Sequence, residues 1–255
     1  MDIMQRALKR VPCVVLVCLT GFGCQRTSRA DLGKEGALAF NWFGHCFLED
    51  CAVPPLMTTT KTSVLVQPHT KEGQRSYSFA GKASFVENSN EAIVVVTPLD
   101  CNTAGCLDLG LEALSPGVAE VRIFDADQRY VDAIDIRVVD PATIQFETQY
   151  PGQRLTERHS VTELIFKVNE LIQDRPYVWA LPYDEEGARL GANSGFSFEV
   201  RDPSVVSAMD CGSPCDSWRG PPGDELALKG VAVGSTELQV TAAQAVGNLP
   251  LTVIP

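Results

Sequence analysis

Cysteines are the residues of this chain whose spacing points most directly to chemistry. The chain has 9 cysteines, and six of them form three close pairs: Cys46 and Cys51, Cys101 and Cys106, and Cys211 and Cys215. Thiolates spaced in this way can bind zinc, which usually takes four Cys or His ligands, or can form local disulfides. Because the pairs lie far apart, and two of them fall at matching places in two halves of the chain, we predict disulfides. Each would close a short loop worth about 2 kcal/mol, with no metal or other cofactor bound.

The histidines are the next candidates for acid–base chemistry or metal binding. They are His45, His69 and His159. A catalytic triad needs a histidine near a nucleophile and a carboxylate, and no serine here lies in a nucleophile-elbow pattern. The segment 45–51 (HCFLEDC) is the densest polar cluster and is the alternative place for a metal. We predict no catalytic residue and no enzymatic activity.

Two groups of acidic residues could in principle hold calcium. Asp125, Asp127 and Asp132 lie close together in the sequence, but an EF-type loop needs a glycine at its sixth position, and none follows here. We therefore interpret these three as a solvated hairpin tip. Residues 184–186 (DEE) are interpreted as a charged turn.

The tryptophans are few, and one of them is a candidate contact residue. Trp218 lies in a loop rich in glycine and proline, SWRGPP, where an aromatic ring could be exposed to a ligand or partner. Trp179 falls at a strand position and is expected to pack in the core.

The N-terminal residues predict the cellular compartment in which the protein functions. Arg6, Lys9 and Arg10 precede the apolar run 11–23, which is too short for a membrane span. A basic start, a short apolar core and a small-residue exit are typical of a secretory signal peptide, here residues 1–23. Export to an oxidising compartment agrees with the predicted disulfides.

The end of this segment, LTGFGC at 19–24, resembles the lipobox of bacterial lipoproteins. That resemblance implies an acylated Cys24 as the mature N-terminus, followed by a polar tether over 24–35. Gly23 fits the pattern, whereas Gly21 stands where leucine is usual. Ordinary cleavage near Cys24 is the alternative. Gln25 follows the cysteine where enterobacterial lipoproteins kept in the inner membrane have aspartate, so the resemblance implies the outer membrane, facing either the periplasm or the cell surface.

Charge excludes one class of partner. The formal charge is -11, and removal of residues 1–23, with three basic residues and one acid, moves it to -13. So acidic a protein should repel nucleic acid, since phosphate binding depends on Lys and Arg. The remaining 232 residues suffice for two domains of ordinary size.

An internal repeat divides the mature chain into two halves. Residues 64–75 (VLVQPHTKEGQR) align with residues 178–189 (VWALPYDEEGAR) at an offset of 114. The strand beginning at Phe85 aligns with that beginning at Phe198 at an offset of 113. The cysteine pairs, a glycine-led strand and a closing alternating strand then follow in the same order. We predict domains at 36–142 and 143–255.

Each half has the pattern of β structure. Residues 121–138 show alternation, a polar turn and alternation again, which predicts a hairpin with one buried face. Gly73 and Gly187 are expected to supply positive φ angles in equivalent turns. Segment 160–173 (SVTELIFKVNELIQ) fits both a helix and a strand, and within a β repeat we favour a strand for its first part.

Both halves resemble bacterial Ig-like domains of the group 2 type, found in intimin-like and invasin-like surface proteins. The similarity is carried by FSFEVRDPSVV at 196–206, VAVGSTELQVTA at 231–242 and the closing strand LTVI. It implies an all-β fold of two tandem Ig-like β-sandwiches. We expect a lipid-anchored envelope protein that makes adhesive or structural contacts with an envelope protein or polysaccharide. A module that binds carbohydrate or cell-wall polymer through the disulfide-closed loops is the alternative.

Overall fold

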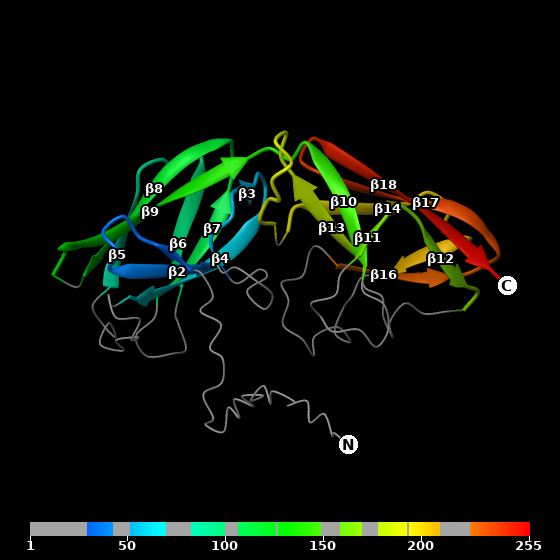
Figure 1. Ribbon diagram of the computed structural model, residues 1–255, viewed down its shortest axis with the longest axis horizontal. Helices are drawn as coiled ribbons and strands as arrows, with labels where there is room; N and C mark the ends of the chain where they lie inside the picture. The colour runs from blue at the N-terminus through cyan, green and yellow to red at the C-terminus, as the bar shows by residue number, and fades with distance from the viewer. Residues whose placement is uncertain are drawn as a thin grey trace, which may run out of the picture.

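The computed structural model describes residues 30–42, 52–69, 83–99, 107–125, 127–148, 159–169, 178–192, 194–209 and 225–255. Its regular elements are all β-strands, as the sequence predicted. Figure 1 shows them as two groups placed end to end along the long axis of the molecule. None of the described segments is a helix with the length and apolar character that a membrane crossing requires.

The N-terminal sandwich consists of β1 to β9. A five-stranded sheet has the order β1-β2-β4-β7-β6, and a four-stranded sheet has the order β3-β9-β8-β5. The strands are β1 Asp31–Leu32, β2 Leu38–Trp42, β3 Leu56–Met57, β4 Lys61–Pro68, β5 Ala83–Asn88, β6 Val94–Leu99, β7 Leu107–Ala113, β8 Gly117–Asp125 and β9 Tyr130–Val139.

The C-terminal sandwich consists of β10 to β18 and repeats this plan. Its two sheets have the orders β11-β10-β13-β16-β15 and β12-β18-β17-β14. The strands are β10 Thr143–Thr148, β11 His159–Val161, β12 Leu164–Lys167, β13 Val178–Tyr183, β14 Phe196–Val200, β15 Val206–Met209, β16 Glu225–Gly230, β17 Gly234–Ala242 and β18 Ala245–Ile254. The first part of segment 160–173 is thus strand, as favoured from the sequence.

The strand order identifies both sandwiches as Ig-like. In an immunoglobulin constant-type domain, the first, second, fifth and fourth strands form one sheet, and the third, sixth and seventh form the other. Strands β2-β4-β7-β6 and β9-β8-β5 reproduce that arrangement, and so do β10-β13-β16-β15 and β18-β17-β14. A short strand, β3 or β12, adds in parallel to the last strand of each unit. The division into independently folding domains at 142/143 stays a prediction.

Alternation of apolar and polar residues builds the two cores. In β18 the odd positions from Ala245 to Val253 are buried, and most of the even positions are exposed. The N-terminal core contains Phe40, Ile123 and Ile136, all at most 2% exposed. The C-terminal core contains Leu238 and Leu249. Trp179 is buried, as expected.

The structure corrects the predicted alignment of one pair of strands. Val86 pairs with Ile123, and Phe198 pairs with Val240. Because Ile123 and Val240 are equivalent positions, the structural counterpart of Phe198 is Val86 at an offset of 112, not Phe85 at 113. A shift of one residue exchanges the faces of a strand. Phe198 packs against the C-terminal core, whereas Phe85 is 47% exposed.

The fold begins inside the segment predicted as a tether. Asp31–Leu32 pair with β2 as strand β1, and the Asp31 carboxylate accepts a hydrogen bond from the Val53 N–H at 2.7 Å. Residues 31–35 therefore belong to the N-terminal sandwich, because main-chain pairing and a side-chain hydrogen bond hold them there.

Candidate functional site

The main chain joins the two sandwiches directly, at a place that we call the junction (residues 54–61, 189–192 and 194–195). The Met57 N–H donates to the Gly191 carbonyl at 2.9 Å, and the Gly191 N–H donates to the Pro55 carbonyl at 2.8 Å. Leu56 and Gly191 form a parallel β-bridge. The short strand β3 is thus paired on one side with β9 and on the other with the C-terminal sandwich.

Side chains from the N-terminal sandwich enter the core of its neighbour at the junction. Met57 is fully buried and belongs to the C-terminal core cluster, although its backbone lies in β3. Gly191 is closely surrounded: a Cβ there would lie 2.6 Å from Pro54 Cγ and 3.2 Å from Trp42 Cζ2. Gly195 has a φ of 91°, and a Cβ at this position would lie 2.7 Å from Thr59 Oγ1. Larger residues would separate the sandwiches.

Polar groups complete the junction. The Lys61 N–H donates to Ser194 Oγ at 2.7 Å, and the Ser194 N–H donates to Thr60 Oγ1 at 3.3 Å. Thr58 Oγ1 donates to Asp140 Oδ1 at 2.7 Å, next to the connection between β9 and β10. The first two of these bonds provide acceptors for backbone N–H groups at the contact between the sandwiches.

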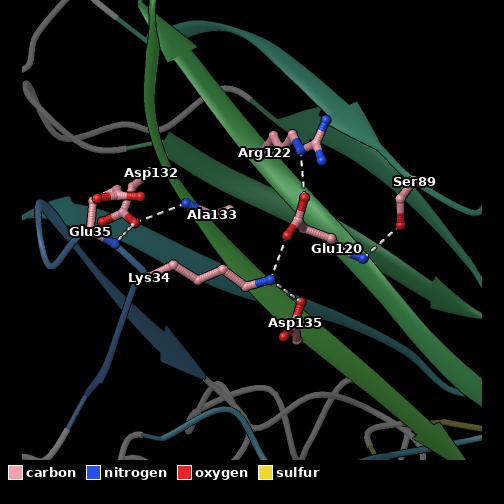
Figure 2. Close-up of polar contacts among 8 residues, drawn as sticks. All are labelled: Lys34, Glu35, Ser89, Glu120, Arg122, Asp132, Ala133 and Asp135. Atoms are coloured by element: carbon pink, nitrogen blue, oxygen red, sulfur yellow. Dashed lines mark hydrogen bonds and ion pairs between the residues drawn. The ribbon is translucent and has the colours of Figure 1, made fainter.

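A buried carboxylate fixes the N-terminal segment to the N-terminal sandwich. Asp132 is fully buried, and its carboxylate accepts hydrogen bonds, each 2.8 Å long, from the N–H groups of Glu35, Ala37, Leu38 and Ala133. Figure 2 shows two of these donors, Glu35 and Ala133, which both donate to the same oxygen, Oδ1. A side chain at Gly33 would overlap it. The prediction that Asp132 lies at a solvated hairpin tip is wrong, because this carboxylate serves as an acceptor for main-chain donors.

A charged group lies on the outer face of β8 and β9 beside this segment. Lys34 forms ion pairs with Glu120 and with Asp135, the latter at 2.7 Å, and Arg122 also contacts Glu120 (Figure 2). Hydrogen bonds from Lys34 and Arg122 hold the pKa of Glu120 below its usual range. Hydrogen bonds to Asp135 and Glu120 raise the pKa of Lys34. The group is open to solvent, so it orients β8, β9 and the N-terminal segment more than it stabilises them.

The other acidic candidates are turn residues. The Asp125 Oδ1 accepts from the N–H groups of Asp127 and Arg129, both at 2.9 Å. Asp184 Oδ1 accepts in the same way from Glu186 and Ala188, and Gly187 has the expected positive φ of 80°. Among the described residues, no group of three or more His, Cys, Asp or Glu side chains could hold a metal ion.

Ten of the residues singled out from the sequence as candidates for chemistry, contacts or turns lie outside the described ranges. They are Cys24, Cys46, Cys51, Cys101, Cys106, Cys211, Cys215, Trp218, His45 and Gly73. The lipid attachment, the disulfides and the Trp218 contact therefore stay predictions. Of the described histidines, His69 is half-buried, and its backbone N–H donates to the Ala37 carbonyl at 2.8 Å. His159 is exposed on β11.

Comparison with known proteins gives structural neighbours alone. No protein family and no curated protein matches the sequence. Domains 4–9 of the surface layer protein SbsC match at 13% identity with a TM-score of 0.32, over 79% of this chain and 30% of that one. The Escherichia coli adhesin FdeC matches at 11% identity with a TM-score of 0.31, over 88% of this chain and 65% of that one. Invasin, a bacterial integrin-binding protein, matches at 12% identity with a TM-score of 0.31, over 88% of this chain and 41% of that one. This chain spans less than two thirds of each.

Proposed function

We propose that this chain is a lipid-anchored protein of the bacterial cell envelope, held in the outer membrane, whose two tandem Ig-like domains (36–142 and 143–255) mediate adhesive or structural contacts. The observation that carries the proposal is the junction, where main-chain hydrogen bonds and the buried Met57 side chain connect the two sandwiches. Such a connection resists bending, because any hinge motion would break backbone hydrogen bonds and expose apolar surface. A stiff pair of sandwiches can hold a contact surface at a fixed distance from a membrane.

The N-terminal attachment supports the same function. Force applied through the anchor would reach the sandwich at residues 31–38, where β1 pairs with β2 and Asp132 binds successive N–H groups. Shared hydrogen bonds of this kind must break together for the segment to detach. The N-terminal sandwich is therefore well connected to a tether that starts at Cys24.

Cell fractionation tests this function. Cells producing the full chain are compared with cells producing Cys24→Ser, which removes the thiol that would be acylated. We expect the native chain in the membrane fraction and the variant in the soluble exported fraction. A chain with Cys18→Ser, which changes a cysteine inside the predicted signal peptide, is the matched control and should stay in the membrane fraction. Equal distribution of native chain and Cys24→Ser would contradict the anchor.

A further inference from the structure

Three aromatic side chains lie next to one another across the outer face of the four-stranded N-terminal sheet. We call Phe85, Phe124 and Tyr130 the aromatic row. Phe124 pairs with Phe85 on β5 and with Tyr130 on β9. The ring centroids of Phe124 and Phe85 are 5.9 Å apart, and those of Phe124 and Tyr130 are 6.0 Å apart, both edge-to-face. Phe85 is 47% and Tyr130 is 46% exposed, so the row presents aromatic surface to solvent.

A β-bulge places Tyr130 in this row. Ile123 pairs with Asp132 and Phe124 pairs with Tyr130, so Val131 is an extra residue in β9. Val131 packs against the N-terminal core together with the inward residues. Because of this extra residue, the inward and outward positions of β9 are interchanged before Asp132. Tyr130 therefore points outward, beside Phe124. Bulges that redirect a side chain in this way are frequent next to functional sites.

The fold does not require aromatic residues at these positions. The same three places in the C-terminal sandwich, given by the pairs Ser197–Thr241 and Thr241–Val246, hold a serine, a threonine and a valine. That sandwich has the same strand order and a complete core. The aromatic row is therefore a feature of the N-terminal sandwich alone and not a requirement for its packing.

The surroundings of the row are acidic. Apart from the buried Asp132, six acidic and four basic residues lie on β5, β8, β9, residues 127–129 and the segment 33–38: Glu35, Glu87, Glu120, Asp125, Asp127 and Asp135 against Lys34, Arg122, Arg129 and Arg137. Three of the basic side chains already form ion pairs, Lys34 and Arg122 with Glu120 and Asp135, and Arg129 with Asp127. Partial burial raises the pKa of Tyr130, and so do the carboxylates of Glu35, Asp132 and Glu120. The local potential thus favours a cation.

We propose that the aromatic row is a docking surface for a partner protein that contributes an arginine- or lysine-bearing segment. Aromatic faces attract guanidinium and ammonium groups, and nearby carboxylates reinforce that attraction. The row lies near the β8–β9 turn, at the end of the N-terminal sandwich opposite the C-terminal one (Figure 1). The proposal rests on the function proposed above, since it names the partner chemistry of one contact surface.

A chemical-shift titration of the full mature chain in detergent at low salt tests this surface. The probe is the peptide (Arg-Ser)5, compared with (Gln-Ser)5 and with the neutral sugar chitohexaose. We expect saturable shifts at residues 85, 124 and 130 with (Arg-Ser)5 alone. The variant Phe85→Ser/Phe124→Thr/Tyr130→Val, which installs the residues of the C-terminal sandwich, should weaken binding about tenfold. Val246→Ser, at the equivalent place in the C-terminal sandwich, is the control and should bind as the native chain does.

Three results would overturn the docking surface. Equal binding of (Arg-Ser)5 to the triple variant would show attraction by net charge alone. Chemical-shift changes confined to other residues would show that the cationic peptide binds elsewhere on the chain. Preferential binding of chitohexaose would show that the row binds a glycan and not a cationic protein segment. The titration does not depend on acylation, so its failure with an intact membrane anchor contradicts this inference and leaves the proposed envelope location standing.

Discussion

The N–H of Met57 donates to the carbonyl oxygen of Gly191, and this bond of 2.9 Å crosses from one sandwich to the other. The Met57 side chain continues into the core of the C-terminal sandwich, where it is fully buried. Backbone pairing and core packing therefore meet at one residue of the junction. Residues on either side of this contact should influence the stability of both sandwiches, which leads to the first two predictions.

Truncation of Met57 should destabilise a sandwich to which its backbone does not belong. Met57→Ala leaves a cavity in the C-terminal core, and we expect a loss of about 2–5 kcal/mol in the free energy of unfolding. Met57→Leu conserves volume and should cost less than about 1.5 kcal/mol. Urea unfolding followed at residues of β17 and β18 measures the effect. Unchanged unfolding of those strands in Met57→Ala would contradict the shared core.

Enlargement of Gly191 should loosen the junction. Gly191→Ala places a methyl group 2.6 Å from Pro54 Cγ, and overpacking of this kind costs about 1–3 kcal/mol. We expect a lower melting temperature and a larger radius of gyration by X-ray scattering. Gly187→Asn is the control, since its Cβ meets nothing within 4 Å and asparagine tolerates its φ of 80°. A radius unchanged in Gly191→Ala would mean that the junction tolerates the added group.

The sequence predicted the fold further than it predicted the contacts. Alternation in 121–138 and in the closing strands located the sheets, because one face of each is buried and the other is wet. The role of Asp132 could not be read from local pattern, since its N–H donors lie more than 90 residues earlier, apart from its neighbour Ala133. The sequence repeat aligns Phe85 with Phe198, one residue out of register. That alignment gives no indication that Phe85 lies on the outer face beside Phe124.

The junction had no local signal at all. Met57 and Gly191 are ordinary residues in their own segments, and they meet only because the C-terminal sandwich docks at the end of the N-terminal one. A glycine next to an apolar stretch is compatible with many loops. The repeat does not predict the junction either, because the position of Met57 in the N-terminal sandwich is occupied by Lys167 in the C-terminal one.

Removal of the Asp132 carboxylate should release the N-terminal segment. Asp132→Ala leaves its buried N–H donors without an acceptor, and we expect a loss of roughly 3–5 kcal/mol. Amide hydrogen exchange at Glu35, Ala37 and Leu38 should become faster. Asp135→Asn, whose native side chain is 52% exposed, is the control and should leave these rates nearly unchanged. Continued protection in Asp132→Ala would show that other contacts hold the segment.

The charged group on β8 and β9 should make a small pH-dependent contribution. Lys34 and Arg122 lower the pKa of Glu120 in the folded chain, so the folded state favours the ionised carboxylate. This contribution is complete above the ordinary glutamate pKa of 4.5 and is lost as the pH falls through the lower folded value. Stability curves of the native chain and Glu120→Gln should therefore converge in acid. Parallel curves down to strongly acidic pH would contradict this assignment.

The central claim is an anchored envelope protein with disulfide-closed loops, and the intact mass of the protein extracted from membranes tests it most directly. The mass is measured after alkylation, with and without prior reduction. We predict a chain that begins at an acylated Cys24 and takes up six alkyl groups only after reduction. A mature chain that begins elsewhere without acyl groups, or six thiols that react before reduction, would contradict the account.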